Sequence, residues 1–324
     1  MNFANATRNQ HFVSQSEQRM NAYSRNNIYE FSILQRGIVE DIRLSEPVPR
    51  AIARNLAIDD LFSFDVAPKA KLRENFEELF QQYEVTVSTL TGSLLEKVAA
   101  KSPNVVAELT DLFAAKLMNF ARNPYCVQKM LNTFPAFKGM HPTDPEQNSV
   151  LEKVLIGRKP RQKYICEQLG ITDVQYREWL ATLFMLLADF QQGRPNFLGQ
   201  AVAGLFNSGE TSAAAMVCTY TTESVLLSDR AMTSNLQSAS GNGFDFNLCS
   251  TAFVRYVFMD KAAALKGKAH PSFIKSALEF SKRHKPVLSL FYENDNLELL
   301  KNYNWHVINQ SHERVFCASK TVLL

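Results

Sequence analysis

The stretch Ile28-Tyr29-Glu30-Phe31-Ser32-Ile33 decides the expected fold, because apolar and polar side chains alternate along it. Such alternation is typical of a strand with one buried face. A further strand is expected at residues 314–319, near the other end of the chain. Strands near both ends, with helical sequence between them, predict one small sheet built from N-terminal and C-terminal strands.

The long middle part of the chain has helical spacing. Leu72, Phe76, Leu79, Phe80 and Tyr83 recur at steps of three and four, which places them on one face of a helix. More helices are expected at 90–101, 104–120, 152–169 and 172–192. We therefore expect a predominantly helical α+β protein in which a large helical block flanks the sheet. It forms a single domain, 1–324, with the block at about 50–206 inserted between strand-bearing segments 1–49 and 207–324.

In the last third of the chain the spacing of apolar residues changes from helical spacing to the alternation typical of strands. Short strands are expected at 214–220, 224–227 and 252–259, and helices at 271–284 and 294–310. Residues 234–247 are rich in Ser, Asn and Gly, which predicts an exposed loop.

Composition excludes several classes of protein. The 324 residues are 46% hydrophobic, enough for a large core, and 35 Lys and Arg against 32 Asp and Glu give a net charge of +3. That balance excludes nucleic-acid binding through net charge alone, although a local basic patch could still bind. The five cysteines contain no Cys-x-x-Cys pair, and the first residues lack the apolar run of a secretory signal. The longest apolar stretch, 179–190, is too short to span a membrane, so we expect a cytoplasmic protein with no membrane partner.

Four short polar segments stand out along the chain. They are Gln10-His11-Phe12-Val13-Ser14-Gln15, Phe190-Gln191-Gln192-Gly193-Arg194-Pro195, Val225-Leu226-Leu227-Ser228-Asp229-Arg230-Ala231-Met232-Thr233, and Val307-Ile308-Asn309-Gln310-Ser311-His312-Glu313-Arg314-Val315-Phe316.

In order and spacing these segments resemble an uncharacterised bacterial family of unknown function. Its members open with Gln-His-Phe/Tyr-Val-Pro-Gln, carry a central Ser-Asp-Asn-Pro-like motif, and close with Asn…Arg-Val-Phe/Tyr. The present chain departs from this pattern at Ser14, where the family has Pro, and at Arg230-Ala231, which replace Asn-Pro. The resemblance implies a mostly helical protein whose signature residues gather in one place. It also implies a bacterial setting such as phage defence or a toxin.

His11 and Asp229 are the first candidates for chemistry, with Arg314 as a third catalytic candidate. A His serves as general base near neutral pH, and an Asp orients it or binds a divalent metal such as Mg²⁺. Arg314 could hold a phosphate by a bidentate contact. Five more residues are expected to bind substrate: Gln10, Gln15, Arg194, Arg230 and Asn309. The alternative is that His11 and Asp229 form a structural pair that fixes the N-terminal segment to the sheet.

A basic cluster precedes a Leu-Gly-Ile-Thr turn between two helical runs, a pattern similar to a helix-turn-helix. The cluster could contact nucleic-acid phosphates, and it consists of Arg158, Lys159, Arg161 and Lys163. The following helix is largely apolar, however, and this favours an ordinary helical hairpin over a helix that contacts base edges.

The sequence thus predicts a cytoplasmic effector that hydrolyses nucleic acid at a site assembled from both chain ends. The alternative is a non-enzymatic sensor or binding module that engages nucleic acid, or a phage or host protein, through its helical surface. An oligomeric assembly protein is a third reading. The enzyme reading predicts that five residues converge in one cleft: Gln10, His11, Asp229, Asn309 and Arg314. The binding reading predicts that His11 and Asp229 lie apart, or pair inside the fold with no opening to solvent.

Overall fold

The computed structural model describes residues 3–67, 72–191, 193–284 and 287–324. Over this part of the chain, 45% of residues are helical and 24% are in strands, which form four sheets. The prediction of a predominantly helical protein with one small sheet is therefore wrong. The strand content was underestimated because many strands are short or rich in small polar residues.

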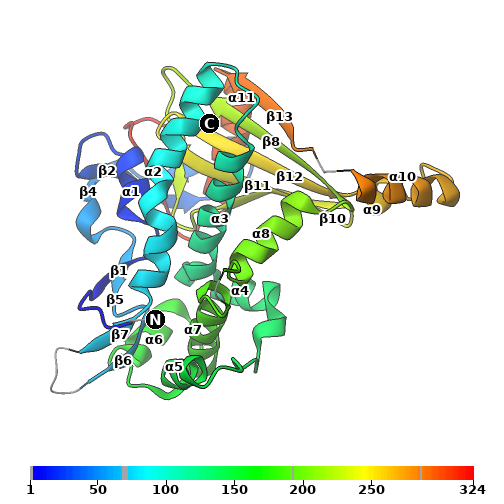
Figure 1. Ribbon diagram of the computed structural model, residues 1–324. Helices are drawn as coiled ribbons and strands as arrows, with labels where there is room; N and C mark the ends of the chain where they lie inside the picture. Colours follow the sequence, from blue (N-terminus) through cyan, green and yellow to red (C-terminus); the bar gives the residue numbers. More distant parts are fainter. Residues whose placement is uncertain (1–2, 68–71, 192, 285–286) are drawn as a thin grey trace.

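The larger of the two main sheets lies at the top right of Figure 1. Its strand order is β10-β11-β12-β8-β13, and β13 runs parallel to β8 while the other neighbours are antiparallel. The strands are β8 (Thr211–Thr219), β10 (Thr233–Ser238), β11 (Gly241–Cys249), β12 (Ala252–Asp260) and β13 (Ser289–Asn294). The predicted loop at 234–247 is thus a hairpin within this sheet. Its strand character comes from Phe244, Phe246 and Leu248, which alternate along β11.

The second five-stranded sheet joins the two ends of the chain. In it β2 pairs antiparallel with β14, with Ser32 opposite Arg314. Its members are β2 (Asn27–Gln35), β3 (Arg43–Leu44), β4 (Val48–Ala51), β9 (Leu227–Ser228) and β14 (Arg314–Cys317). The expected pairing of terminal strands therefore occurs, but in one sheet of four.

Two small sheets place three strands, β5 to β7, in a region expected to be helical. They pair β1 (Asn9–His11) with β5 (Ala57–Asp59), and β6 (Ser63–Val66) with β7 (Arg73–Asn75). The predicted start of the helical block at residue 50 is wrong, since the first long helix begins at Glu77. Phe62 and Phe64 are fully buried here, and periodicity cannot separate so short a buried strand from a helix.

Helices cover both faces of the larger sheet and form a separate layer below it (Figure 1). They are α1 (Gln15–Met20), α2 (Glu77–Ala99), α3 (Val106–Arg122), α4 (Val127–Thr133), α5 (Pro145–Ile156), α6 (Gln162–Leu169), α7 (Asp173–Leu187), α8 (Phe197–Asn207), α9 (Lys261–Leu265), α10 (Pro271–Arg283) and α11 (Leu297–Gln310). The helix α7 is mostly buried, as its apolar sequence predicted.

Aromatic side chains join these layers. On one face of the sheet, Phe113 of α3 makes edge contacts with Phe246 and Tyr256, with ring centroids 5.6 and 5.0 Å apart. On the other face, Tyr303 of α11 stacks on Phe253 at 4.2 Å. The sheet is therefore held between α3 and α11.

One part of the chain leaves the body of the protein. The helices α9 and α10 connect β12 to β13 and project sideways as an arm (Figure 1). We call residues 261–284 the arm.

Candidate functional site

Asp229 is buried and acts as an acceptor for the backbone of the C-terminal segment. Its Oδ1 accepts the N–H of His312 at 2.7 Å, and its Oδ2 accepts those of Glu313 and Arg314 at 2.8 and 2.9 Å. Burial raises the pKa of the Asp229 carboxyl, and the three N–H donors oppose that rise. Since these donors present positive charge to both oxygens, they compete with any cation for the carboxylate.

His11 and Gln10 lie on β1 and bond to the segment around β5. The Nε2 of His11 is 3.3 Å from the Ile52 carbonyl oxygen, and Gln10 Oε1 accepts the Phe62 N–H at 2.5 Å. Burial lowers the pKa of His11, and the nearby Arg122 lowers it further. In the described residues no hydrogen bond or ion pair joins His11 to Asp229.

An aromatic stack connects the first and last signature segments instead. Tyr125 stacks on His312 with ring centroids 4.1 Å apart, and Phe12 meets the edge of Tyr125 at 5.4 Å. Asn123 donates to the Asp229 carbonyl at 2.8 Å. The segments around His11 and Asp229 are therefore neighbours through residues 123–125, although the two side chains make different bonds.

The other expected binding residues fall into several environments. Asn309 holds the turn at Gly37, where its side chain accepts the N–H at 3.0 Å and donates to the carbonyl at 3.1 Å. Gln15 accepts a bond from Arg19 at 2.6 Å. Arg194 is exposed in the turn before α8, and Arg230 is half-buried with an Nε that has no hydrogen-bond partner. The structure does not bring these four residues to one cleft.

Arg314 lies in a surface groove of about 430 Å³ that also holds Arg50 and Arg54. The buried carboxylate of Glu30 fixes two of these guanidinium groups, at 2.9 Å from Arg50 and 3.3 Å from Arg314. Each guanidinium has five N–H donors, so both keep donors free to face an anion. We call this the arginine groove. His11 contacts the carbonyl oxygen of Ile52, which lies between Arg50 and Arg54 in the sequence.

The basic cluster at residues 158–163 makes both local contacts and contacts with the segment at 59–65. Arg161 pairs with Asp59 at 3.4 Å and lies over the Tyr164 ring, while Lys163 is almost fully exposed and pairs loosely with Glu167. The amine of Lys159 donates to Gly157, and burial lowers its pKa to about 8. Arg158 is exposed, and its backbone N–H bonds to Asp65.

A cluster of buried charges was not expected from the sequence. Lys116 of α3 pairs with Glu17 of α1, and Arg122 pairs with Glu84 of α2 at 2.5 Å. Asn119 links the two pairs through bonds to Glu17 and Arg122. Buried charges of this kind occur only when paired. The spacing of residues 116, 119 and 122 on an otherwise apolar helix face is the signal that could have revealed them.

Glu77 faces this cluster from the start of α2. Burial raises the pKa of its carboxyl to about 7, and its Oε1 has no hydrogen-bond partner. Perturbed groups of this type mark either functional sites or structural networks.

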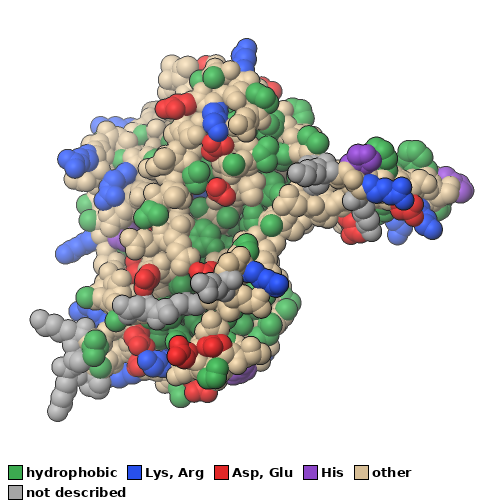
Figure 2. All heavy atoms as spheres, in the orientation of Figure 1, with side chains coloured by type: hydrophobic (Ala, Val, Ile, Leu, Met, Phe, Trp, Pro, Cys, Tyr) green, Lys and Arg blue, Asp and Glu red, His purple; other side chains and the backbone are tan. Residues whose placement is uncertain are grey.

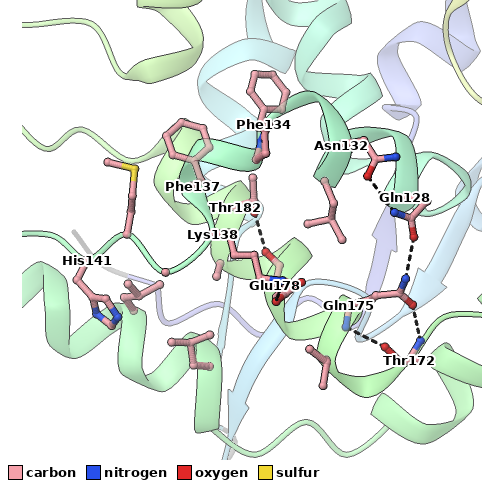
Figure 3. Close-up of a pocket in the computed structure, with 18 residues that line it drawn as sticks. Gln128, Asn132, Phe134, Phe137, Lys138, His141, Thr172, Gln175, Glu178 and Thr182 are labelled. Atoms are coloured by element: carbon pink, nitrogen blue, oxygen red, sulfur yellow. Dashed lines mark hydrogen bonds and ion pairs between the residues drawn. The ribbon is translucent and has the colours of Figure 1, made fainter.

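A cleft of about 940 Å³ lies in the helical layer, shown in Figure 3. It lies between α4 with the following turn, α5, and the first turns of α7. Its apolar wall consists of Leu131, Phe134, Phe137, Met140, Leu151, Leu155, Val174 and Ala181. We call it the helical cleft.

A row of amide side chains forms the polar wall of the helical cleft (Figure 3). Gln175 donates to Gln128 at 2.7 Å, and Gln128 donates to Asn132 at 3.1 Å. Lys138 and Glu178 pair at 3.1 Å across the cleft, so their charges offset each other. Sequence reasoning missed this site because its residues come from three helices and form no motif.

No group of three or more His, Cys, Asp or Glu residues in the described ranges could hold a metal ion. All five cysteines are unpaired. A search of the same residues finds no helix that is long and apolar enough to cross a membrane.

No protein-family model matches this chain, and no curated protein or solved structure is significantly similar to it. The family resemblance of the four segments therefore stays a prediction.

Proposed function

We propose that this protein is a binding module that holds a peptide segment of a partner protein in the helical cleft. The observation that carries the proposal is the cleft itself, with an apolar wall facing a row of amides. Its volume of about 940 Å³ is at the upper end of the range for ligand pockets.

The chemistry of the cleft favours a peptide over a nucleic acid. Side-chain amides both donate and accept hydrogen bonds, which suits the N–H and C=O groups of a peptide backbone. Phe134 and Phe137 line the cleft and add apolar surface for a partner's side chains. Because the charges of Lys138 and Glu178 cancel, phosphate groups would find no free cation there.

The hydrogen bonding of Asp229 also supports a binding module over a hydrolase. Both of its oxygens already accept backbone N–H groups, which leaves this carboxylate poorly placed to orient a His or bind Mg²⁺.

The setting proposed for the module is the bacterial cytoplasm, in phage defence or as a toxin. It rests on the family resemblance and agrees with five unpaired cysteines.

The test blocks the cleft with a single side chain. Peptides are selected from an mRNA-displayed random library against the wild-type chain, and their Kd values are compared for Ala181→Trp and Ala107→Trp. Ala181 lines the cleft, and Ala107 is an exposed position on α3. We expect Ala181→Trp to weaken binding at least about tenfold because the indole fills the cleft, while Ala107→Trp leaves it unchanged. Equal binding by both variants, or failure to select any peptide, would refute the proposal.

A hydrolase acting on nucleic acid is the second candidate, and the arginine groove favours it. Three guanidinium groups line that groove around one carboxylate, which leaves a positive charge for a phosphate. The test compares nucleic-acid cleavage and toxicity of wild type, His11→Ala and Arg314→Ala, with Mg²⁺ or Mn²⁺ and with chelator. Loss of cleavage in variants that keep their thermal stability would support this candidate. Absence of wild-type cleavage would remove it.

A further inference from the structure

The arm projects from the body of the protein and buries little of its surface. None of its described side chains is buried, although α10 alone is 13 residues long. Phe273 and Phe280 are 61% and 64% exposed. An isolated helix of this length is marginal in water, so α10 needs a surface to pack on.

The side chains of α10 are divided between two faces. Phe273 and Phe280 lie two turns apart on one side, next to Ala277, which turns toward α9. Lys275 lies on the opposite side together with Glu279, and Arg283 lies beside Phe280, at the border between the two sides. Figure 2 shows this division, with green side chains along one edge of the arm and blue ones along another.

The arm also carries a disproportionate positive charge. Residues 261–284 contain six Lys or Arg and one Glu, a net +5 in a chain whose whole net charge is +3. The rest of the chain is therefore slightly negative. Charge separated in this way directs the arm, and not the body, toward an anionic surface.

We infer that the arm binds the surface of an anionic lipid bilayer, with Phe273 and Phe280 inserted at the level of the headgroups. A helix with a strongly cationic face, an aromatic face and low overall hydrophobicity has the character of an interfacial helix, which lies in the membrane surface and does not span it. The cytoplasmic leaflet supplies the matching negative charge.

A bilayer fits both faces of α10, whereas a nucleic acid fits one. Phosphates of DNA or RNA would pair with the lysines, but the grooves of a duplex give no apolar medium for two exposed phenyl rings. In a bilayer the rings enter the interface while Lys275 and Arg283 stay beside the headgroup phosphates.

The test uses the full chain and vesicles of defined composition. Co-sedimentation is measured with phosphatidylcholine alone and with an equimolar mixture of phosphatidylcholine and phosphatidylglycerol. We expect binding to the mixed vesicles, at least about tenfold weaker binding to neutral ones, and release at high salt. Phe273→Ser with Phe280→Ser, and separately Lys268→Glu with Lys275→Glu, should each reduce binding about tenfold or more.

Matched controls make the result specific to the arm. Val85→Ser removes an equally exposed apolar side chain from α2, and Lys163→Glu reverses an exposed charge on α6; neither should change vesicle binding. A Phe280→Trp variant should show a blue-shifted fluorescence spectrum when mixed vesicles are added.

Wild type that stays in solution, or controls that reduce binding as much as the arm variants, would overturn the inference. The inference would also be overturned by a second pattern of results. In that pattern the protein binds duplex DNA, the Lys variants abolish this binding, and the Phe variants still bind vesicles. None of these readouts involves the helical cleft.

Discussion

At the scale of single residues, Asp229 is a structural centre of the C-terminal region. Its carboxylate accepts three consecutive backbone N–H groups at the start of β14. We expect Asp229→Ala to lower the free energy of unfolding by about 3 kcal/mol, because the variant leaves buried donors without an acceptor. Urea unfolding measures this change. The exposed Asp111→Ala should cost less than about 0.5 kcal/mol, and equal effects of the two variants would contradict the assignment.

Glu77 gives the protein a pH-dependent stability. The ordinary pKa of this carboxyl is 4.5, and burial raises it to about 7 in the folded chain. Between these values the unfolded chain loses its proton first, so the stability contributed by this group falls as pH rises from about 4.5 to about 7.

Glu77→Gln removes that titration, since the amide stays neutral. We expect the variant to gain about 2 kcal/mol relative to wild type at pH 8 and almost nothing at pH 4.5. Urea unfolding at the two pH values measures the difference. Glu78→Gln, at the exposed neighbouring position, should give the same difference from wild type at both.

Three of the polar signature residues make structural contacts with the backbone. Gln10, Asp229 and Asn309 were selected as polar signature residues, and in the structure all three hold backbone groups in place. Which partner a buried carboxylate meets depends on tertiary contacts, and no spacing rule contains that information. Lys116 and Arg122 were missed because a charged residue in a helix normally indicates a solvent-exposed face.

At the scale of elements, the β10–β11 hairpin depends on close packing at Gly241. A Cβ added there would lie 2.4 Å from the Met259 sulfur and 2.6 Å from the Phe258 carbonyl oxygen. We expect Gly241→Ala to destabilise the protein by about 2 kcal/mol in thermal or urea unfolding. Gly204→Ala, in the open on α8, should instead stabilise it by about 0.5–1 kcal/mol. If Gly241→Ala stabilised the protein instead, β12 would be able to move away from the added methyl group, and the prediction would be wrong.

The helices were easier to predict than the strands. The helical spacing near residues 76–83 and 104–120 is long enough to define α2 and α3, although the end positions shifted. The hairpin was missed because Ser, Asn and Gly favour turns when considered alone, and its strands form only when β12 pairs beside them. Strand pairing is a long-range property, so a local pattern predicts it poorly.

At the scale of the whole molecule, Phe113 joins the helical layer to the larger sheet. Its ring contacts Phe206 of α8 on one side and Phe244, Phe246 and Tyr256 on the other. Phe113→Ala should lower the free energy of unfolding by about 3–5 kcal/mol. Hydrogen exchange should become faster in both α8 and β12, because both elements lose their contact with the Phe113 ring. Faster exchange in one layer alone would indicate two independent cores.

The pairing of β2 with β14 has a consequence for how the chain folds as it leaves the ribosome. Ser32 meets Arg314 only after 282 further residues have been added. At about 5–20 residues per second, β2 waits roughly 15–60 s for this partner. During that time β4 can cover one of its edges, since Val48–Ala51 follows it closely, while the other edge stays open. The protein is thus exposed to misassociation for most of its own synthesis, and a nascent-chain chaperone would act on that open edge.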